Sequence, residues 1–376
     1  MLIKPRAGQA ARIKVIGIGG GGGNAIASMI AEGGIGGVEF VAVNTDAQAL
    51  LNNKAVNKIQ IGENLTKGLG SGGDPEIGRQ AAEESRERLK EELSGVDMIF
   101  ITAGEGGGTG TGAAPVVAEV ARETGALTVA VVTKPFDFEG VKRKFTADDG
   151  ISKLKEKVDT LIIVPNQKIL TVIDKKTPIL EAFKKIDSVL HQGVKGIAEL
   201  ITTPGLINVD FADVRSIMQN SGTALMGMGV GSGDKRAMAA IKQAISSQLL
   251  DVNIEGAKGV LFNIVGGPDL SMTEIDEAAS IIAKSVDADA DIIFGAVIDD
   301  KMMDQIKITI IATKFDDSKL KLFRFTKKEP IQETNEEESA DIKQSADDMK
   351  KNDNFEAEDF ADDSSEFDIP AFLRKK

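Results

Sequence analysis

The chain has 376 residues, of which 42% are hydrophobic, and a formal net charge of −13 at pH 7. It contains one histidine and no cysteine, tryptophan or tyrosine, which excludes disulfides, cysteine-based zinc sites and histidine metal clusters. The single histidine, His191, lies in a predicted helical run and gives no candidate for a Ser-His-Asp triad. We expect a soluble, cytoplasmic protein without direct transmembrane insertion, because the first residues include no apolar signal segment and no apolar run approaches ~18 residues.

The negative charge is concentrated near the C-terminus. Residues 329–368 contain 16 acidic and 3 basic residues, so this segment carries the whole net charge and the rest of the chain is neutral. The acidity therefore says nothing about what the folded body binds, and we expect no nucleic-acid partner.

Apolar runs alternate with helical segments in the first half of the chain. Asp74 and Pro75 predict the N-cap and first residue of a helix that extends to about Leu93. The alternation predicts an α/β fold, a Rossmann-like parallel sheet with helices on both faces. The first predicted strand runs over 11–18 and contains IKVIGI. The other predicted strands are 38–43, 58–61, 98–101, 127–132 and 161–164.

Two glycine-rich segments follow predicted strands. Gly104–Gly112 (GEGGGTGTG) precedes a predicted helix, and Gly19–Gly23 with Asn24 follows the first strand. Glycines permit close approach of backbone N–H groups to an anion, and a helix N-terminus adds donors. A flexible turn is the alternative for the first segment, and a dinucleotide-binding turn for the second. Two such loops on one sheet edge favour a phosphate-rich nucleotide, although the lysine of a P-loop is missing.

A long helix is predicted from Pro178 to Thr202, about 37 Å at 1.5 Å per residue. Phe183 and Asp187 are four residues apart and share one face. A ring that stacks on a base and a carboxylate that accepts two hydrogen bonds would suit guanine. The commoner roles, a core phenylalanine and a surface charge, remain open from the residues alone.

Asp210 and Asp213 follow the stop of this helix. Two carboxylates with this spacing usually cap a helix, and the alternative is that they polarise an attacking water. The helix end lies about 22 Å beyond Asp187. Chemistry on the nucleotide is therefore easier if these carboxylates act on a neighbouring molecule, and such a heterologous contact gives filaments.

The sequence that follows Asp213 predicts a smaller second domain and a C-terminal tail. The spacing of strands 292–297 and 306–312 resembles a hairpin and suggests a mixed or partly antiparallel sheet. Residues 327–366 have a composition typical of disorder. Residues 367–376 place apolar side chains at helical spacing and could bind a partner's groove. A frayed terminus is the alternative, and direct membrane binding is disfavoured because one short apolar turn is a weak anchor.

The motifs resemble those of the tubulin/FtsZ family almost throughout the chain. They are GGGGN at 20–24, NTDAQAL at 44–50, GGGTGTG at 106–112, TKPFDFEG at 133–140, NVDFADV at 208–214 and the terminal DIPAFLRKK. The resemblance implies that Asn208, Asp210 and Asp213 complete hydrolysis on the next subunit. It also implies a nucleotide site made of Gly20, Gly21, Gly22, Gly23, Asn24, Asn44, Asp46, Gly70, Gly106, Gly107, Gly108, Thr109, Gly110, Thr133, Glu139, Arg143, Asn166, Phe183 and Asp187.

Within that site the family pattern assigns the phosphates to the glycine loops. It assigns ribose and phosphate contacts to Glu139 and Arg143, and guanine to Phe183 and Asp187. The cofactors implied are GTP/GDP and Mg²⁺, which would bridge the β- and γ-phosphates and is assigned no protein ligand.

The function implied is a GTPase that polymerises head to tail in the bacterial division ring at midcell. Residues Asp368–Lys376 would bind membrane-anchoring and regulatory division proteins. A dinucleotide-dependent oxidoreductase is the other interpretation, although it leaves the second loop, the long helix and the tail unexplained. The expected parts are a flexible N-terminus (1–10), a GTP-binding domain (11–177), the central helix (178–202), a second domain (203–316), an acidic disordered linker (317–366) and the partner-binding peptide (367–376).

Glu105 departs from the family pattern, which usually has an apolar residue there. An anion beside the phosphate loop would repel the nucleotide if it pointed inward. We therefore expect its side chain to point outward.

Overall fold

The structure is a computed structural model that describes residues 11–171, 173–174, 176–203, 205–246 and 254–316. The expected N-terminal segment, acidic linker and terminal peptide lie outside the described residues. Among the helices that are described, none combines the length and hydrophobicity needed to cross a bilayer.

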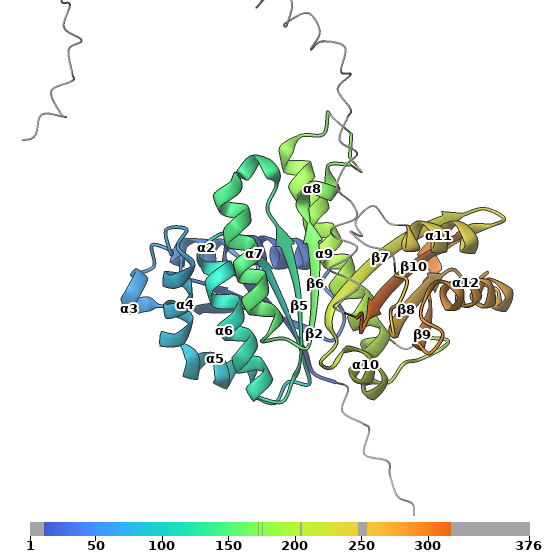
Figure 1. Cartoon of the computed structure of the whole chain (residues 1–376), viewed down its shortest axis with the longest axis horizontal. Helices are drawn as coiled ribbons and strands as arrows, with labels where there is room; N and C mark the ends of the chain where they lie inside the picture. The colour runs from blue at the N-terminus through green and yellow to red at the C-terminus, as the bar shows by residue number, and fades with distance from the viewer. Residues whose placement is uncertain (1–10, 172, 175, 204, 247–253, 317–376) are drawn as a thin grey trace, which may run out of the picture. The chain divides into compact units, whose positions relative to one another are not determined.

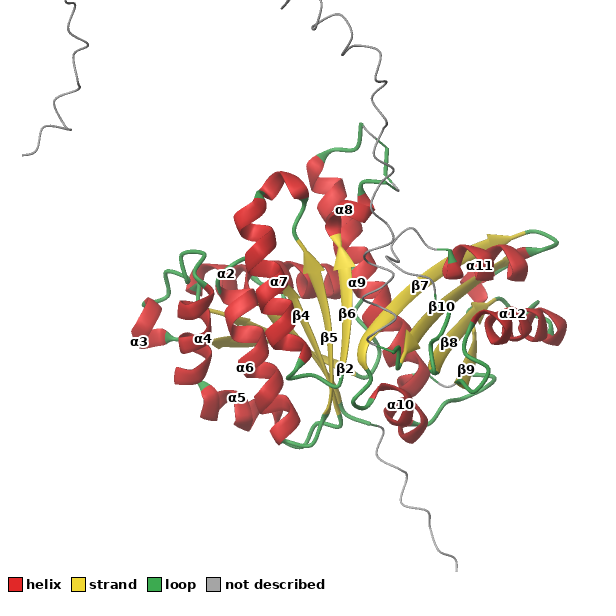
Figure 2. Cartoon of the chain, in the orientation of Figure 1, coloured by secondary structure: helices red, strands yellow, loops and turns green. Residues whose placement is uncertain are grey.

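In the described part of the chain, ten strands form one sheet in the order β3-β2-β1-β4-β5-β6-β7-β10-β8-β9 (Figures 1 and 2). All neighbouring pairs from β3 to β7 are parallel, which confirms the predicted α/β half. Its strands are β1 (Ile13–Ile18), β2 (Val38–Asn44), β3 (Asn57–Gln60), β4 (Met98–Gly104), β5 (Leu127–Lys134) and β6 (Thr160–Pro165).

Strand residues alternate between two cores, as the period of two requires. Ile13 and Val15 of β1 belong to a core that includes residues of helices α1, α9 and α10. Ile16 and Ile18 belong to the other core, which includes residues of α4, α5, α6 and α7. Helices therefore cover both faces, as predicted. Their bounds are α1 (Gly19–Ala31), α2 (Ala47–Asn52), α3 (Glu63–Thr66), α4 (Pro75–Glu84), α5 (Arg86–Leu93), α6 (Thr109–Glu123), α7 (Val141–Lys155), α8 (Asn166–Ile169), α9 (Ile179–Thr202) and α10 (Phe211–Met218), with a 3₁₀ turn η1 (Asp137–Glu139).

Two helix boundaries refine the sequence predictions. The Asp74 side chain accepts a hydrogen bond from the N–H of Glu76, and Pro75 is the first helical residue. This helix does not run unbroken to Leu93, because α4 ends before Ser85 and α5 begins after it. The central helix α9 begins one residue after Pro178 and ends as predicted.

The second half of the sheet is mixed. Strand β10 (Gln305–Thr313) pairs antiparallel with β7 (Gly222–Ser232) and with β8 (Gly259–Gly266), and β8 is parallel to β9 (Asp291–Ile298). The mixed sheet is confirmed, but the hairpin between the last two strands is wrong, because β8 lies between them. The covering helices are α11 (Arg236–Ile245) and α12 (Met272–Ser285), and a 3₁₀ turn η2 (Asp300–Met302) follows β9.

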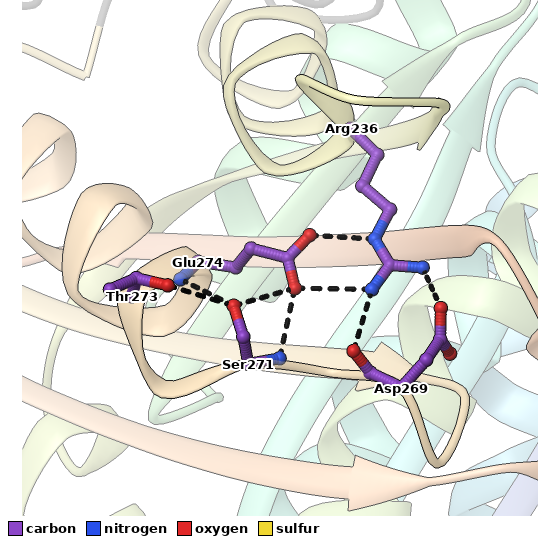
Figure 3. Close-up of polar contacts among 5 residues, drawn as sticks. All are labelled: Arg236, Asp269, Ser271, Thr273 and Glu274. Atoms are coloured by element: carbon purple, nitrogen blue, oxygen red, sulfur yellow. Dashed lines mark hydrogen bonds and ion pairs between the residues drawn. The ribbon is translucent and has the colours of Figure 1, made fainter.

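A buried arginine joins these two covering helices (Figure 3). Arg236 begins α11, and its guanidinium contacts Asp269 and donates from Nε to Oε1 of Glu274 at 2.6 Å. Ser271 caps α12 and forms a capping box with Glu274. The hydrogen bond from Arg236 lowers the pKa of Glu274 to about 2. The network therefore fixes α11 to the start of α12.

Candidate nucleotide site

Two helix N-termini meet at the carboxyl edge of the parallel strands. The expected loop at Gly19–Gly23 is instead the first turn of α1, which starts at Gly19. A Cβ on Gly22 would lie 2.2 Å from the carbonyl oxygen of Thr102, and one on Gly110 would lie 2.6 Å from that of Gly104. These glycines are required by backbone-to-backbone packing, which argues against a merely flexible turn.

Other glycines of the same segments face open space. No atom lies within 4 Å of the Cβ position of Gly20 or Gly107. Gly108 immediately precedes Thr109, the first residue of the 15-residue α6. The unpaired N–H groups of α1 and α6 and their positive dipole ends therefore form a site suited to an anion.

Buried hydroxyls hold the start of α6, and two of them, those of Thr45 and Ser71, were not singled out from the sequence. The hydroxyl of Thr109 is 2.7 Å from that of Thr45 and 2.9 Å from that of Ser71. Thr45 lies in the NTDAQAL motif, and Ser71 lies in the glycine-rich GLGSGG segment. Both are recognisable only once the fold brings them to the start of α6.

Residues at the end of β2 line another side of the candidate site. Asn44 is buried, and its Oδ1 accepts a hydrogen bond from the N–H of Asp46 at 3.2 Å. Asp46 caps α2 and forms an isolated bridge with Leu69, which brings the loop containing Gly70 to this edge. A cavity of about 190 Å³ is lined by residues of α1 and β2, among them Gly20, Gly23, Asn24 and Asn44.

The predicted ribose contacts are paired with each other. Glu139 accepts a hydrogen bond from the N–H of Phe136 at 2.9 Å, and its second oxygen is 2.9 Å from Nη1 of Arg143. The ring of Phe183 meets that of Phe136 edge to face, with centroids 5.7 Å apart. Phe183 is 43% exposed, so its side chain is not part of the buried core.

Asp187 lies one helical turn beyond Phe183 and is half-buried. Burial raises the pKa of its carboxyl to about 6, with a smaller contribution from the negative charge of Glu32. Glu32 follows the last residue of α1 and is 2.5 Å from Nδ1 of the buried His191 on α9. Sequence reasoning missed Glu32, because no motif links it to the central helix.

Two predicted residues lie at the ends of neighbouring strands. The carbonyl oxygen of Thr133, in β5, accepts the N–H of Glu105 at 3.0 Å. Asn166 is buried at the start of α8, and its Oδ1 has no hydrogen-bond partner among the described residues. A buried acceptor of this kind suits a ligand that supplies a donor.

Glu105 does not point outward, so that expectation is wrong. The residue is 4% exposed, and neither carboxyl oxygen has a hydrogen-bond partner within the described ranges. Burial raises the pKa of its carboxyl to about 8, against a smaller opposing effect of the Thr111 hydroxyl. The neutral acid is therefore the main form at pH 7, and the predicted repulsion of phosphate does not apply to it.

Of the predicted catalytic residues, Asn208 lies on the loop that joins α9 to α10, Asp210 is the N-cap of α10, and Asp213 lies in the first turn of that helix. Asn208 Oδ1 accepts the N–H of Gly205 at 2.6 Å. Asp210 caps α10 and accepts the N–H of Asp213 at 2.9 Å, so the capping role is confirmed for Asp210. Both aspartates are exposed. Figure 1 shows α10 at the opposite end of α9 from α8, so one chain does not bring them to its own nucleotide edge.

These features are typical of a class of protein, the α/β nucleotide-binding proteins, in which helix N-termini at the carboxyl edge of a parallel sheet bind phosphates. Residues 12–174 match the GTPase domain of the tubulin/FtsZ family, and residues 222–316 match the C-terminal domain of the FtsZ family. The match favours guanine nucleotide over the dinucleotide of an oxidoreductase.

Solved structures agree with these matches. An empty FtsZ dimer from M. jannaschii shares 48% sequence identity and a TM-score of 0.77, over 81% of this chain and 88% of that one. CetZ2 from Haloferax volcanii, solved as a GTPγS-bound protofilament, shares the fold with a TM-score of 0.69 at 20% identity, over 84% and 97% of the two chains. The chain belongs to the FtsZ family. It is a GTPase that binds guanine nucleotide, and the family consists of filament-forming cell-division GTPases.

Proposed function

We propose that this chain polymerises head to tail and hydrolyses GTP at the interface between subunits. The single observation that carries the proposal is the separation along α9 of the nucleotide residues from the acidic loop. Asp187 lies 15 residues before the helix end, about 22 Å along the axis. A head-to-tail contact would bring the exposed Asp210 and Asp213 of one subunit to the phosphates of the next.

Exposed apolar side chains support association at the nucleotide edge. Leu69 is 87% exposed, Val141 is 85% exposed and Ile179 is 67% exposed, and each lies in a segment next to the proposed site. On the opposite side of the interface, Leu206 is 67% exposed two residues before Asn208. Exposed apolar groups at both ends suit a contact that buries them in the filament.

In this mechanism the N–H groups at the starts of α1 and α6 hold the phosphates, and Phe183 and Asp187 hold guanine. Asp213 of the neighbouring subunit would accept a hydrogen bond from water and orient it toward the γ-phosphate. Asp210, fixed as the cap of α10, would position Asp213. Asn208, which holds the loop through Gly205, would shape the same surface.

Mg²⁺ would be held in this site mainly by the phosphates of the nucleotide. Among the described residues, no group of three or more acidic or histidine side chains could hold a metal. Mg²⁺ commonly uses one or two carboxylates, water and substrate phosphates, so the phosphates would be its main ligands. When bound, Mg²⁺ would neutralise part of the negative charge of the phosphates.

Mixing variants tests the interfacial mechanism. Asp213→Ala should bind GTP normally but lose turnover, and Asp187→Ala should bind GTP poorly but retain Asp213. A mixture of the two should recover part of the turnover, because the first variant supplies the nucleotide and the second the carboxylate. If Asp213→Ala loses GTP binding, or the mixture recovers nothing while still forming mixed polymers, the mechanism is wrong.

We also propose that the polymers form the division ring at midcell in the cytoplasm, and that Asp368–Lys376 bind membrane-anchoring and regulatory division proteins. The acidic segment and the apolar spacing at the C-terminus support this role. Deleting residues 367–376 should preserve polymerisation and abolish recruitment of partners. Loss of polymers would contradict a role limited to tethering.

A further inference from the structure

Glu105 occupies an unusual place beneath the phosphate loop. Its N–H is held by Thr133, as described above, and the next residue, Gly106, donates its N–H to Oγ1 of Thr111 at 2.8 Å. The loop is thus anchored on both sides of a buried carboxyl group. Neither of its oxygens has a partner with hydrogen-bond geometry among the described residues, and the nearby Thr111 hydroxyl offsets its burial only in part. An unpartnered buried carboxyl is costly, and its ionised form is far costlier.

The neighbouring helix leaves room for this carboxyl. A Cβ on Gly150 of α7 would lie 2.7 Å from Oε2 of Glu105 and 2.2 Å from Cγ2 of Thr111. Any larger residue at position 150 would push Glu105 and Thr111 toward the loop. The side chain of Glu105 is therefore housed by the packing of α6 against α7.

No opposite charge among the nearby described groups compensates an ionised Glu105. The charged residues of α7 around Gly150 and Gly106 are already paired: Arg143 with Glu139, Lys153 with Asp149, and Asp148 with Lys134 of β5. The basic groups that line the same cavity as Thr111 and Gly150 are also paired, Arg79 of α4 with Glu76 and Lys157 with Glu119 of α6. Burial is the main cause that raises the pKa of Glu105, and no charge contributes to the shift. Ionisation would place an unpaired anion in the segment that leads to the start of α6, where the N–H groups are proposed to face phosphate.

We propose that Glu105 is a positioning residue of the phosphate loop, and that nucleotide polyphosphate binds to the form of the chain in which this carboxyl is protonated. The inference rests on the proposed placement of the phosphates at the starts of α1 and α6. Phosphate and ionised Glu105 oppose each other, so polyphosphate binding at alkaline pH is accompanied by uptake of one proton. The proton is bound by the carboxyl, and no bond of the nucleotide changes.

The test is the affinity for GDP, in the absence of Mg²⁺, between pH 6.5 and 9.5 for the unmodified protein and Glu105→Gln. Glutamine has the same shape and cannot ionise. For the unmodified protein we expect the highest affinity between about pH 7 and 8 and, above about pH 8, a fall that approaches tenfold per pH unit. For Glu105→Gln that fall should be absent. Alkaline ionisation of the guanine base affects both proteins equally, so the difference between the profiles is the readout.

Two further measurements separate positioning from a general loss of structure. Calorimetry in buffers of different ionisation enthalpy should detect proton uptake with GDP near pH 8 in the unmodified protein and none in Glu105→Gln. Guanosine, which lacks phosphates, should show equal pH profiles in the two proteins. If the variant does not fold, Glu105→Met provides the same comparison.

The outcomes distinguish this inference from the function on which it rests. Superimposed GDP profiles for the two proteins, or equal proton uptake, would overturn the role of Glu105 while leaving GTP binding intact. Failure of both proteins to bind GDP at pH 7 would instead contradict the proposed site. A difference between the proteins that is as large for guanosine as for GDP would also overturn the inference, since it would not depend on phosphate.

Discussion

The ionisation of Asp187 makes a quantitative prediction about guanine recognition. A carboxylate can accept hydrogen bonds from two donors of guanine, and a protonated carboxyl loses part of that capacity. The pKa of Asp187 is raised from 3.8 to about 6. The affinity for GDP should therefore fall as the pH decreases through about 6, approaching tenfold per unit.

Glu32→Gln is the informative perturbation. Two effects raise the pKa of Asp187, and burial is the larger, so the charge of Glu32 accounts for the smaller part of the rise. Removing the charge of Glu32 should lower the pH at which the GDP affinity falls on acidification, by less than about one pH unit. The glutamine side chain can still accept a hydrogen bond from His191 through its amide oxygen, so the contact between α1 and α9 is retained in part.

The assay is equilibrium binding of GDP from pH 4.5 to 7.5, with the fraction of folded protein checked at each pH. Glu277→Gln is the matched control, because it removes the same charge from an exposed position on α12. Protonation of the terminal phosphate of GDP occurs in all three proteins and cancels in the comparison. If Glu32→Gln and Glu277→Gln give the same midpoint as the unmodified protein, the assigned coupling between Glu32 and Asp187 is wrong.

Two stability predictions follow from packing and burial. Gly112→Ala places a Cβ 1.9 Å from the carbonyl oxygen of Pro75, so it should lower the unfolding free energy by roughly 1–3 kcal/mol. The control variant, Gly36→Ala, meets no atom within 4 Å and should change the unfolding free energy little. Denaturant titration measures both. Burial raises the pKa of Glu105 from 4.5 to about 8, so the folded state loses stability as the pH rises through this window. The stability advantage of Glu105→Gln should therefore grow from near zero at pH 4.5 toward about 5 kcal/mol at pH 8, and equal pH slopes for the two proteins would refute it.

The parallel half of the fold could be predicted because its strands are nearly uninterrupted apolar runs. Strand β1 was predicted with its end at Ile18 and its start two residues too early, and the Asp74-Pro75 start of α4 follows from local capping chemistry. Strand β7 was not predicted, since four glycines interrupt its pattern. The reason for two of them is tertiary: a Cβ on Gly229 or Gly231 would lie 1.9 Å from a carbonyl oxygen of α11.

The site was predictable where motifs carry it and not where it depends on distant packing. The first turn of α1 was expected to be a loop because glycine is a poor helix former, yet close backbone packing overrides that preference. The orientation of Glu105 depends on Gly150, which lies on another helix and belongs to none of the motifs. The influence of Glu32 on Asp187 likewise arises from the packing of α1 against α9.

The most direct test of the central claim is GTP turnover per molecule as a function of protein concentration, with Mg²⁺ present. A site completed by Asp210 and Asp213 of a second subunit predicts a threshold concentration below which turnover vanishes. Sedimentation should detect polymer above the same concentration. A turnover per molecule that is constant down to concentrations without polymer would contradict hydrolysis at the interface, because each chain would then hydrolyse GTP alone.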